Sequence, residues 1–133
     1  MSDHPTLPPY AIAMGMRIEA IEADGAPVIA LDYSDRAEGR PGYLHGGAIG
    51  GLLEMAAYAA LHAALGAEDA QVRIKPVNIS IEYLRAGLPR QIQAAGQVLR
   101  AGRRVANVRA EAWQDDRSKP IASCWVNFLL RPR

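Results

Sequence analysis

The strongest constraint on the fold is one apolar segment, Ala48–Leu65, which reads AIGGLLEMAAYAALHAAL. Its eighteen residues approach the length at which a membrane-spanning helix becomes a candidate. Glu54 and His62 lie inside it, however, and Ala and Gly outnumber the large apolar residues. A carboxylate in lipid is costly, and no basic cluster flanks the segment to orient it. The segment therefore predicts a helix surrounded by protein, and no membrane partner.

Segments with strand character lie on both sides of this helix. Apolar and polar residues alternate along them, which is typical of strands with one buried face. A loop rich in Asp, Gly and Pro is expected over Ser34–Leu44, and Gly66 is expected to end the helix. Pro76 indicates a strand start or a bulge. The expected strands are Met16–Ala20, Val28–Tyr33, Val77–Tyr83, Gln91–Ala101, Arg103–Gln114 and Ile121–Leu130.

The order of these elements constrains the architecture. The helix has apolar or small residues on nearly every side, so a sheet that covered one stripe would leave the rest exposed. A curved antiparallel sheet wrapped around the helix would cover most of its circumference. The sequence therefore predicts one α+β domain over residues 1–133, in which residues 1–9 form a mobile N-terminal arm.

Composition excludes several classes of protein. Lys and Arg number 15 and Asp and Glu number 14, a formal net charge of +1, which argues against a nucleic-acid partner. The single cysteine, Cys124, excludes an internal disulfide and a cysteine-rich zinc site. The first nine residues have no basic region followed by an apolar run, so we expect a cytoplasmic protein without a signal peptide.

The most informative motif is GYLHGGAIGGLLEMAAY, which begins at Gly42. His45 precedes Gly46 and Gly47, which we expect in the first turn of the helix. Backbone N–H groups there lack intrahelical partners and lie at the positive end of the helix dipole. Such groups can bind an anion or polarise a carbonyl group. His45 could equally be a simple helix cap or turn residue, and on sequence alone that structural role is the commoner one.

Glu54 is the carboxylate of this helix, two turns beyond the glycines. Helical spacing places it on one stripe with Tyr58 and His62. A carboxylate held there could act as a general base on water or attack a carbonyl directly. It could also pair with an arginine across a subunit interface. Tyr58 and His62 are interpreted as core or interface residues, and the spacing of His45, Glu54 and His62 fits no usual metal site, so no metal is expected.

These residues resemble a known family. The run Gly42-Tyr43-Leu44-His45-Gly46-Gly47, followed by Glu54, is similar to the hotdog-fold acyl-CoA thioesterases of the PaaI-like group. The resemblance extends to Met14-Gly15-Met16, to the strand end Tyr83-Leu84-Arg85-Ala86-Gly87, to the Gly102 hairpin and to the last strand. It implies a hotdog fold, in which an antiparallel sheet encloses one central helix.

The resemblance also implies roles for individual residues. Glu54 matches the catalytic acid, Gly46 the backbone donor to the thioester carbonyl, and His45 and Gly47 the loop that shapes the site. Family members are homodimers or dimers of dimers, so Glu54 would face the partner's loop. The substrate would be an acyl-CoA or acyl-carrier thioester, with no separate cofactor. Further candidates for substrate binding are Gly39, Arg40, Tyr58, Arg85, Arg103 and Arg104, the last three as contacts of the CoA phosphates.

The sequence also departs from the family pattern. Gly39 stands where many members have an Asn or Gln that positions the attacking water, Tyr58 where one subgroup has a small hydroxyl residue, and Lys75-Pro76 where some have a serine. Thioester hydrolysis is the function this pattern favours. Two alternatives stay open: a hydratase or dehydratase on the same fold, and a non-catalytic protein that binds acyl-CoA or another small ligand.

Overall fold

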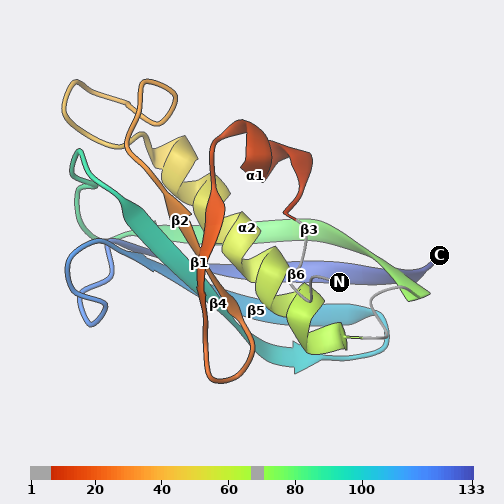
Figure 1. The fold of residues 1–133 in the computed structure, drawn as a ribbon. Coiled ribbons are helices and arrows are strands. Elements are labelled where there is room, and N and C mark those ends of the chain that lie inside the picture. The colour runs from red at the N-terminus through yellow and green to blue at the C-terminus, as the bar shows by residue number, and fades with distance from the viewer. Residues whose placement is uncertain (1–6, 67–70) are drawn as a thin grey trace.

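Six antiparallel strands form one curved sheet around one long helix in the computed structural model, which describes residues 7–66 and 71–133 (Figure 1). The strand order in the sheet is β1-β2-β4-β5-β6-β3. This arrangement confirms the α+β hotdog fold. The elements are α1 (Pro9–Ala13), β1 (Arg17–Ile21), β2 (Pro27–Leu31), α2 (Gly46–Leu65), β3 (Val72–Tyr83), β4 (Ile92–Ala101), β5 (Val105–Trp113) and β6 (Ala122–Pro132).

Helix α2 lies across the concave side of the sheet (Figure 1). It is long and apolar enough to span a membrane by length and composition, yet most of its residues are buried inside the protein. Small residues permit a close approach to β4. A Cβ at Gly96 would lie 2.8 Å from the carbonyl oxygen of Ala56 and 2.9 Å from the Cβ of Ala60, so only glycine fits at that crossing.

The core lies between α2 and the inward faces of the strands. Along β5 and β6 alternate residues are fully buried, among them Val108, Val126 and Phe128. Cys124 belongs to the same row of β6 and is buried in the core. The period-two pattern thus determines which side chains contact the helix.

Three details of the sequence-based assignment were wrong. Leu7 is buried and Pro9 begins α1, so residues 7–9 are not a mobile arm; residues 1–6 lie outside the described residues. Ala20 is exposed because a bulge follows Ile18 and shifts the register of β1. The strand that was expected from residue 77 begins at Val72. Val72 and Ile74 alternate with Arg73 and Lys75, but Pro76 and the bulge after it interrupt the pattern, and the expected strand began only beyond the proline.

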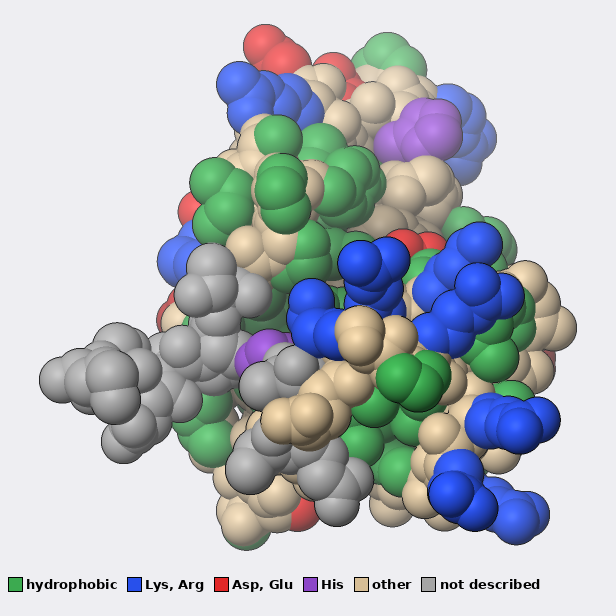
Figure 2. Space-filling model, turned by 90° about the vertical axis from the view of Figure 1, so that its right-hand side faces the viewer, with side chains coloured by type: hydrophobic (Ala, Val, Ile, Leu, Met, Phe, Trp, Pro, Cys, Tyr) green, Lys and Arg blue, Asp and Glu red, His purple; other side chains and the backbone are tan. Residues whose placement is uncertain are grey.

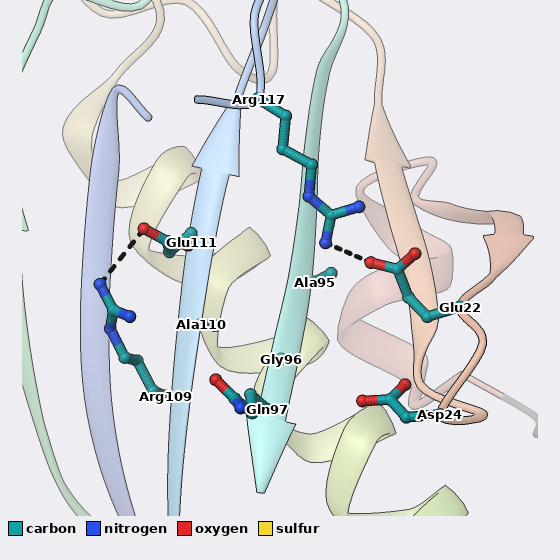
Figure 3. A pocket seen from close by; sticks show the side chains of 9 residues that line it. All are labelled: Glu22, Asp24, Ala95, Gly96, Gln97, Arg109, Ala110, Glu111 and Arg117. Carbon is teal, nitrogen blue, oxygen red and sulfur yellow. Dashed lines mark hydrogen bonds and ion pairs between the residues drawn. The ribbon is translucent and has the colours of Figure 1, made fainter. Parts of the chain in front are cut away.

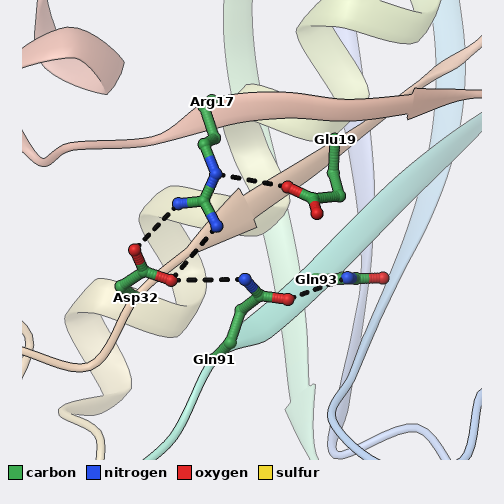
Figure 4. Close-up of polar contacts among 5 residues, drawn as sticks. All are labelled: Arg17, Glu19, Asp32, Gln91 and Gln93. Carbon is green, nitrogen blue, oxygen red and sulfur yellow. Dashed lines mark hydrogen bonds and ion pairs between the residues drawn. The ribbon is translucent and has the colours of Figure 1, made fainter.

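The two edge strands of the sheet differ in length and in how they are held. Strand β1 has five residues, and a polar network joins it to the residue after β2 and the residue before β4 (Figure 4). Arg17 pairs with Asp32 at 2.9 Å and with Glu19 at 3.2 Å, and Asp32 also accepts a hydrogen bond from Gln91. These bonds, with that from Arg17 first, lower the pKa of Asp32.

Strand β3, at the opposite edge, has twelve residues and pairs on one side only, with β6. A bulge between Pro76 and Asn78 interrupts it, as the proline indicated. Val77 at the bulge is 56% exposed. A long edge strand with an exposed apolar residue is a ready template for pairing with another strand.

Candidate active site

The loop before α2 is held by hydrogen bonds from both of its neighbours. The carboxylate of Glu38 accepts hydrogen bonds from the Tyr33 hydroxyl and the Gly42 amide, and these bonds lower the pKa of Glu38. The Leu44 amide donates to the carbonyl oxygen of Gly87, 2.9 Å away, which joins the loop to the segment after β3. The start of α2 is therefore held in a fixed place.

His45 is the N-cap of α2. Its backbone is extended, and its Nδ1 atom accepts a hydrogen bond from the Gly47 amide at 2.7 Å. The structural role considered for His45 is thus present in the structure. Because the cap occupies the Gly47 amide, that group is not available to a ligand in this conformation. Within the described residues the Gly46 amide donates no hydrogen bond, so Gly46 offers the free donor at the helix start.

Two tyrosines that the sequence did not single out as site residues contact this end of α2. The Tyr83 hydroxyl donates to the carbonyl oxygen of Gly46 at 2.8 Å, and its ring lies 3.5 Å from where a Cβ on Gly46 would be. Tyr10 of α1 covers Gly51, where any Cβ would collide with its ring. Tyr83 could have been found from its place at the end of a predicted strand. Nothing in the sequence marks Tyr10 as a site residue.

Glu54 lies half-buried on α2. Eight residues separate it from Gly46, about 12 Å along the helix axis. Burial raises the pKa of the Cys124 thiol to about 11, the Ala110 backbone opposes the rise, and the Glu54 carboxylate adds to it. The carboxylate is therefore near the inward face of β6. Glu54 and Gly46 of one chain are too far apart to act on the same carbonyl group.

A cavity of about 240 Å³ adjoins the helix start. The Arg40 guanidinium lies 4.7 Å from the centre of the Tyr43 ring, so a cation is held at its wall. Arg85 is not among the lining residues, because its guanidinium donates to the carbonyl oxygen of Pro120. The cavity is lined by Gly39, Arg40, Tyr43, Leu44, His45, Gly46, Ala86 and Gly87.

Gly39 packs directly against the backbone of the capping residue. A Cβ at this position would lie 2.9 Å from the Cα of His45. A real Cβ does not approach backbone so closely, so an Asn or Gln could be placed here only if the loop moved. The packing of Gly39 against His45 therefore excludes the amide side chain that many family members have at this position.

The remaining expected residues lie farther along the molecule. Tyr58 and His62 stack at 6.1 Å between ring centres, on one face of α2 as their spacing predicted. Arg103 and Arg104 lie in the hairpin between β4 and β5, at the other end of α2 from Gly46 of the same chain (Figure 1). The described residues include no group of three His, Cys, Asp or Glu side chains that could hold a metal ion.

A second cavity, of about 160 Å³, is lined by β4, β5 and the two turns next to them (Figure 3). Its charged side chains are largely paired with one another, Arg117 with Glu22, and Arg109 with Glu111 at 3.2 Å. Neither Gly46 nor Glu54 contributes to it. This cavity is therefore separate from the candidate active site.

Comparison with known proteins agrees with this geometry. The thioesterase superfamily matches residues 41–121, more than half of the chain, including the end of the loop, α2 and the three strands β3, β4 and β5. No curated protein matches the sequence of this chain. The chain belongs to the thioesterase superfamily, whose members act on thioesters.

Several solved structures share the fold. A Chromobacterium violaceum protein is 37% identical, with 91% of this chain and 82% of that chain covered and a TM-score of 0.69. A conserved Pseudomonas aeruginosa protein is 24% identical, with coverage of 93% and 94% and a TM-score of 0.81. A Ralstonia eutropha protein described as a candidate thioesterase related to phenylacetic acid degradation is 23% identical, with coverage of 94% and 92% and a TM-score of 0.79.

Proposed function

We propose that this protein hydrolyses acyl-CoA or a related acyl thioester in the cytoplasm, at a site built from two copies of the chain. The observation that carries the proposal is the free amide of Gly46 at the positive end of α2, with the half-buried carboxylate of Glu54 on the same helix. A donor of this kind stabilises the negative charge that develops on a thioester oxygen. Membership of the thioesterase superfamily supports the same reaction class.

The spacing along α2 argues for a shared site. A general base has to lie within hydrogen-bonding reach of the attacking water, which is itself in contact with the carbonyl carbon. The separation of about 12 Å between Gly46 and Glu54 of one chain is too large for that geometry. A second copy related by a two-fold axis would bring its Glu54 to the first copy's Gly46, and the reverse pair would form equally.

The long edge strand supplies the surface for such a dimer. Strand β3 would pair antiparallel with its copy, because its outer edge is open and Val77 is exposed. Antiparallel pairing places the Arg73–Lys75 end of one strand beside the Glu82 end of the other. Glu82 has one negative charge and the facing end has the two positive charges of Arg73 and Lys75, so the pairing is favoured and this end stays net positive. A dimer of dimers would add a second interface.

In the proposed reaction, hydrolysis proceeds in two steps. Water attacks the carbonyl carbon while the Glu54 carboxylate accepts its proton, and the Gly46 amide donates to the oxygen that becomes negative. The tetrahedral intermediate collapses, the carbon–sulfur bond breaks, and the thiolate receives the proton from Glu54. Direct attack by Glu54 on the carbonyl is the other route: the carbon–sulfur bond breaks, the thiolate leaves and a mixed anhydride forms on Glu54. Water then cleaves the anhydride to the free acid and the carboxylate of Glu54, and the released proton goes to the thiolate. Gly39 favours this route, because no side chain at that position can position a water for the attack on the thioester.

The same contact of Gly39 with His45 also supports a second candidate, a binding protein for acyl-CoA or a similar ligand that does not hydrolyse it. A hydratase or dehydratase has no comparable observation in its favour. Release of free thiol from a panel of acyl-CoAs separates hydrolysis from binding. Ligand-dependent stabilisation without thiol release would identify the binding protein.

The first test replaces the acid. Glu54→Gln should lower kcat by at least about 100-fold, because a positioned general base contributes factors of about 10²–10⁴. Glu19→Gln on β1 is the matched control, since it removes an exposed carboxylate at the far edge of the sheet. Unchanged turnover in folded Glu54→Gln would refute the mechanism.

The second test asks whether two copies share each site. Gly46→Ala and Glu54→Gln proteins, each inactive alone, are mixed after mild dissociation. Random reassociation should restore about a quarter of the wild-type activity, because half of the dimers are mixed and each has one intact site. A site built within one chain would give no recovery.

A further inference from the structure

One end of the sheet gathers nearly half of the basic side chains of the protein. It is the end at which α2 finishes, and Figure 2 shows Lys and Arg gathered there. All seven side chains are exposed, and in the described part of the chain none of them forms an ion pair. The basic end, as this surface is called below, consists of Arg73, Lys75, Arg100, Arg103, Arg104, Arg131 and Arg133.

These seven residues are a large share of the basic residues in the chain. The seven are drawn from 15 Lys and Arg residues, so the rest of the chain holds eight basic against 14 acidic residues. Glu68 and Asp69, the acids nearest in sequence to Arg73, lie outside the described residues. Among the described side chains, positive charge is thus concentrated at one end of the protein.

The register of the strands fixes how the basic end is arranged. Arg73 on β3 lies directly opposite Arg131 on β6. Two like charges in directly opposed positions destabilise a sheet, so this pair costs stability that a neutral residue would not. The amide of Leu130 donates to the carbonyl oxygen of Arg104 at 2.7 Å, which holds the β4–β5 hairpin against β6 beside that pair. The arginines are therefore presented together on ordered backbone.

Apolar side chains lie among these cations. Leu99 and Val105 are each 46% exposed, and Val105 lies opposite Leu129, which lies opposite Lys75. A hollow of about 340 Å³ opens between Arg100, Arg103 and Val105. The surface is thus cationic and aliphatic together, across the width of three strands and a hairpin.

This mixture selects among possible partners. Phosphate groups of a nucleotide would use a few cations but no exposed Leu or Val. Single-stranded nucleic acid would use exposed aromatic rings for stacking, and the described residues place none at this end. An acidic protein surface with apolar side chains among its carboxylates would use both features, and attraction between opposite charges would speed its encounter.

We infer that the basic end docks the small acidic carrier protein that holds the acyl chain as a thioester, so that the substrate is delivered on a protein. The inference rests on the proposed function, because it needs a thioester site served by this surface. In the antiparallel dimer, the basic end of one copy and the Gly46 loop of the other lie at the same end of the assembly. The docked carrier could then extend its thioester into the partner's site.

The test compares one acyl group on three thiols: the carrier protein, CoA, and pantetheine, which has no phosphate. The variant is Arg131→Glu, which places a carboxylate opposite Arg73 and should not impair folding. Its control is Lys119→Glu, the same charge change in the exposed β5–β6 turn, which is not part of the basic end. The ratio of kcat/KM for acyl-carrier to that for acyl-pantetheine should fall roughly tenfold in Arg131→Glu and stay within twofold of wild type in Lys119→Glu.

Two results in this assay would overturn the inference: an equal loss with acyl-CoA, which would indicate a phosphate site, or no selective loss at all. A binding arm separates the inference from the proposed function. Carrier without an acyl group is titrated into isotope-labelled Glu54→Gln protein, and chemical shift changes should centre on Arg131 and the β4–β5 hairpin.

Binding there with no hydrolysis of any thioester would leave the docking surface standing and refute the proposed function. Hydrolysis without such binding would refute the docking surface alone. Shift changes produced by single-stranded RNA but not by the carrier would also refute it.

Discussion

The two ends of α2 present opposite kinds of surface. At the N-terminal end the loop is tightly bonded, Gly46 has one free amide, and the neighbouring cavity is small. At the C-terminal end Gly66 finishes the helix, and the surrounding strands present arginines that form no ion pair with any described residue. The difference fits the two proposed roles: stabilising a reacting carbonyl needs one donor in a fixed position, whereas binding a large anionic partner needs several exposed positive charges. Cations near a helix C-terminus are also favoured by the helix dipole.

The variant Gly46→Ala is expected to have the largest effect, and it tests whether the N-terminal end of α2 supplies the donor. The new Cβ would lie 3.5 Å from the Tyr83 ring, an ordinary contact, so the fold should be retained. The methyl group would stand beside the free amide and keep a carbonyl group away from it. Loss of one such donor should reduce kcat by about 10²–10³-fold. Thiol release measures the rate, and urea unfolding checks that stability is unchanged; full activity would show that Gly46 is not the donor.

The buried thiol of Cys124 should make the stability of the protein depend on pH. Its pKa is about 11 in the folded protein and near 8.5 when unfolded. Because the folded state holds the proton more tightly, stability is complete below about pH 8.5 and falls as the pH rises toward 11. The loss should be about 3 kcal/mol, measured by urea unfolding across that range. Cys124→Ala is the comparison, and curves of equal slope would contradict the buried neutral thiol.

Two substitutions, one at each end of α2, are expected to have smaller effects and allow the two ends to be compared directly. His45→Ala removes the cap and should cost about 1 kcal/mol of unfolding free energy. Gly66→Ala puts a side chain at φ +54° and should cost a similar amount, about 1 kcal/mol. Only His45→Ala should also lower turnover of acyl-pantetheine, because it alone loosens the Gly46 loop. If the two variants lost turnover equally, the loss would be explained by lower stability and not by a change in the Gly46 loop.

Much of the fold could be predicted because its signals are local. The long helix, the hairpin strands and the end of α2 at Gly66 follow from apolar patterning and glycine. Two elements were not predicted for equally physical reasons. Helix α1 has only five residues, too few for a periodic pattern. In β3 the alternation of apolar and polar residues is interrupted at Pro76 and the bulge after it.

The candidate site divides in the same way. His45, Gly46 and Glu54 could be proposed from their spacing because all three belong to one loop and helix. The contacts of Tyr83 with Gly46, of Tyr10 with Gly51 and of Gly39 with His45 join segments that come together in folding, and spacing does not record them.

By itself the sequence determined a helix that needed a sheet around it, a glycine pair at its start and one acid two turns later. Those properties are local, because backbone conformation and side-chain period act over a few residues. Only the tertiary structure decided that the Gly47 amide is occupied by His45 and that seven cations from three separate segments share one end of the sheet. Strand pairing sets both sheet order and register, and it brings together charges that lie far apart in the chain.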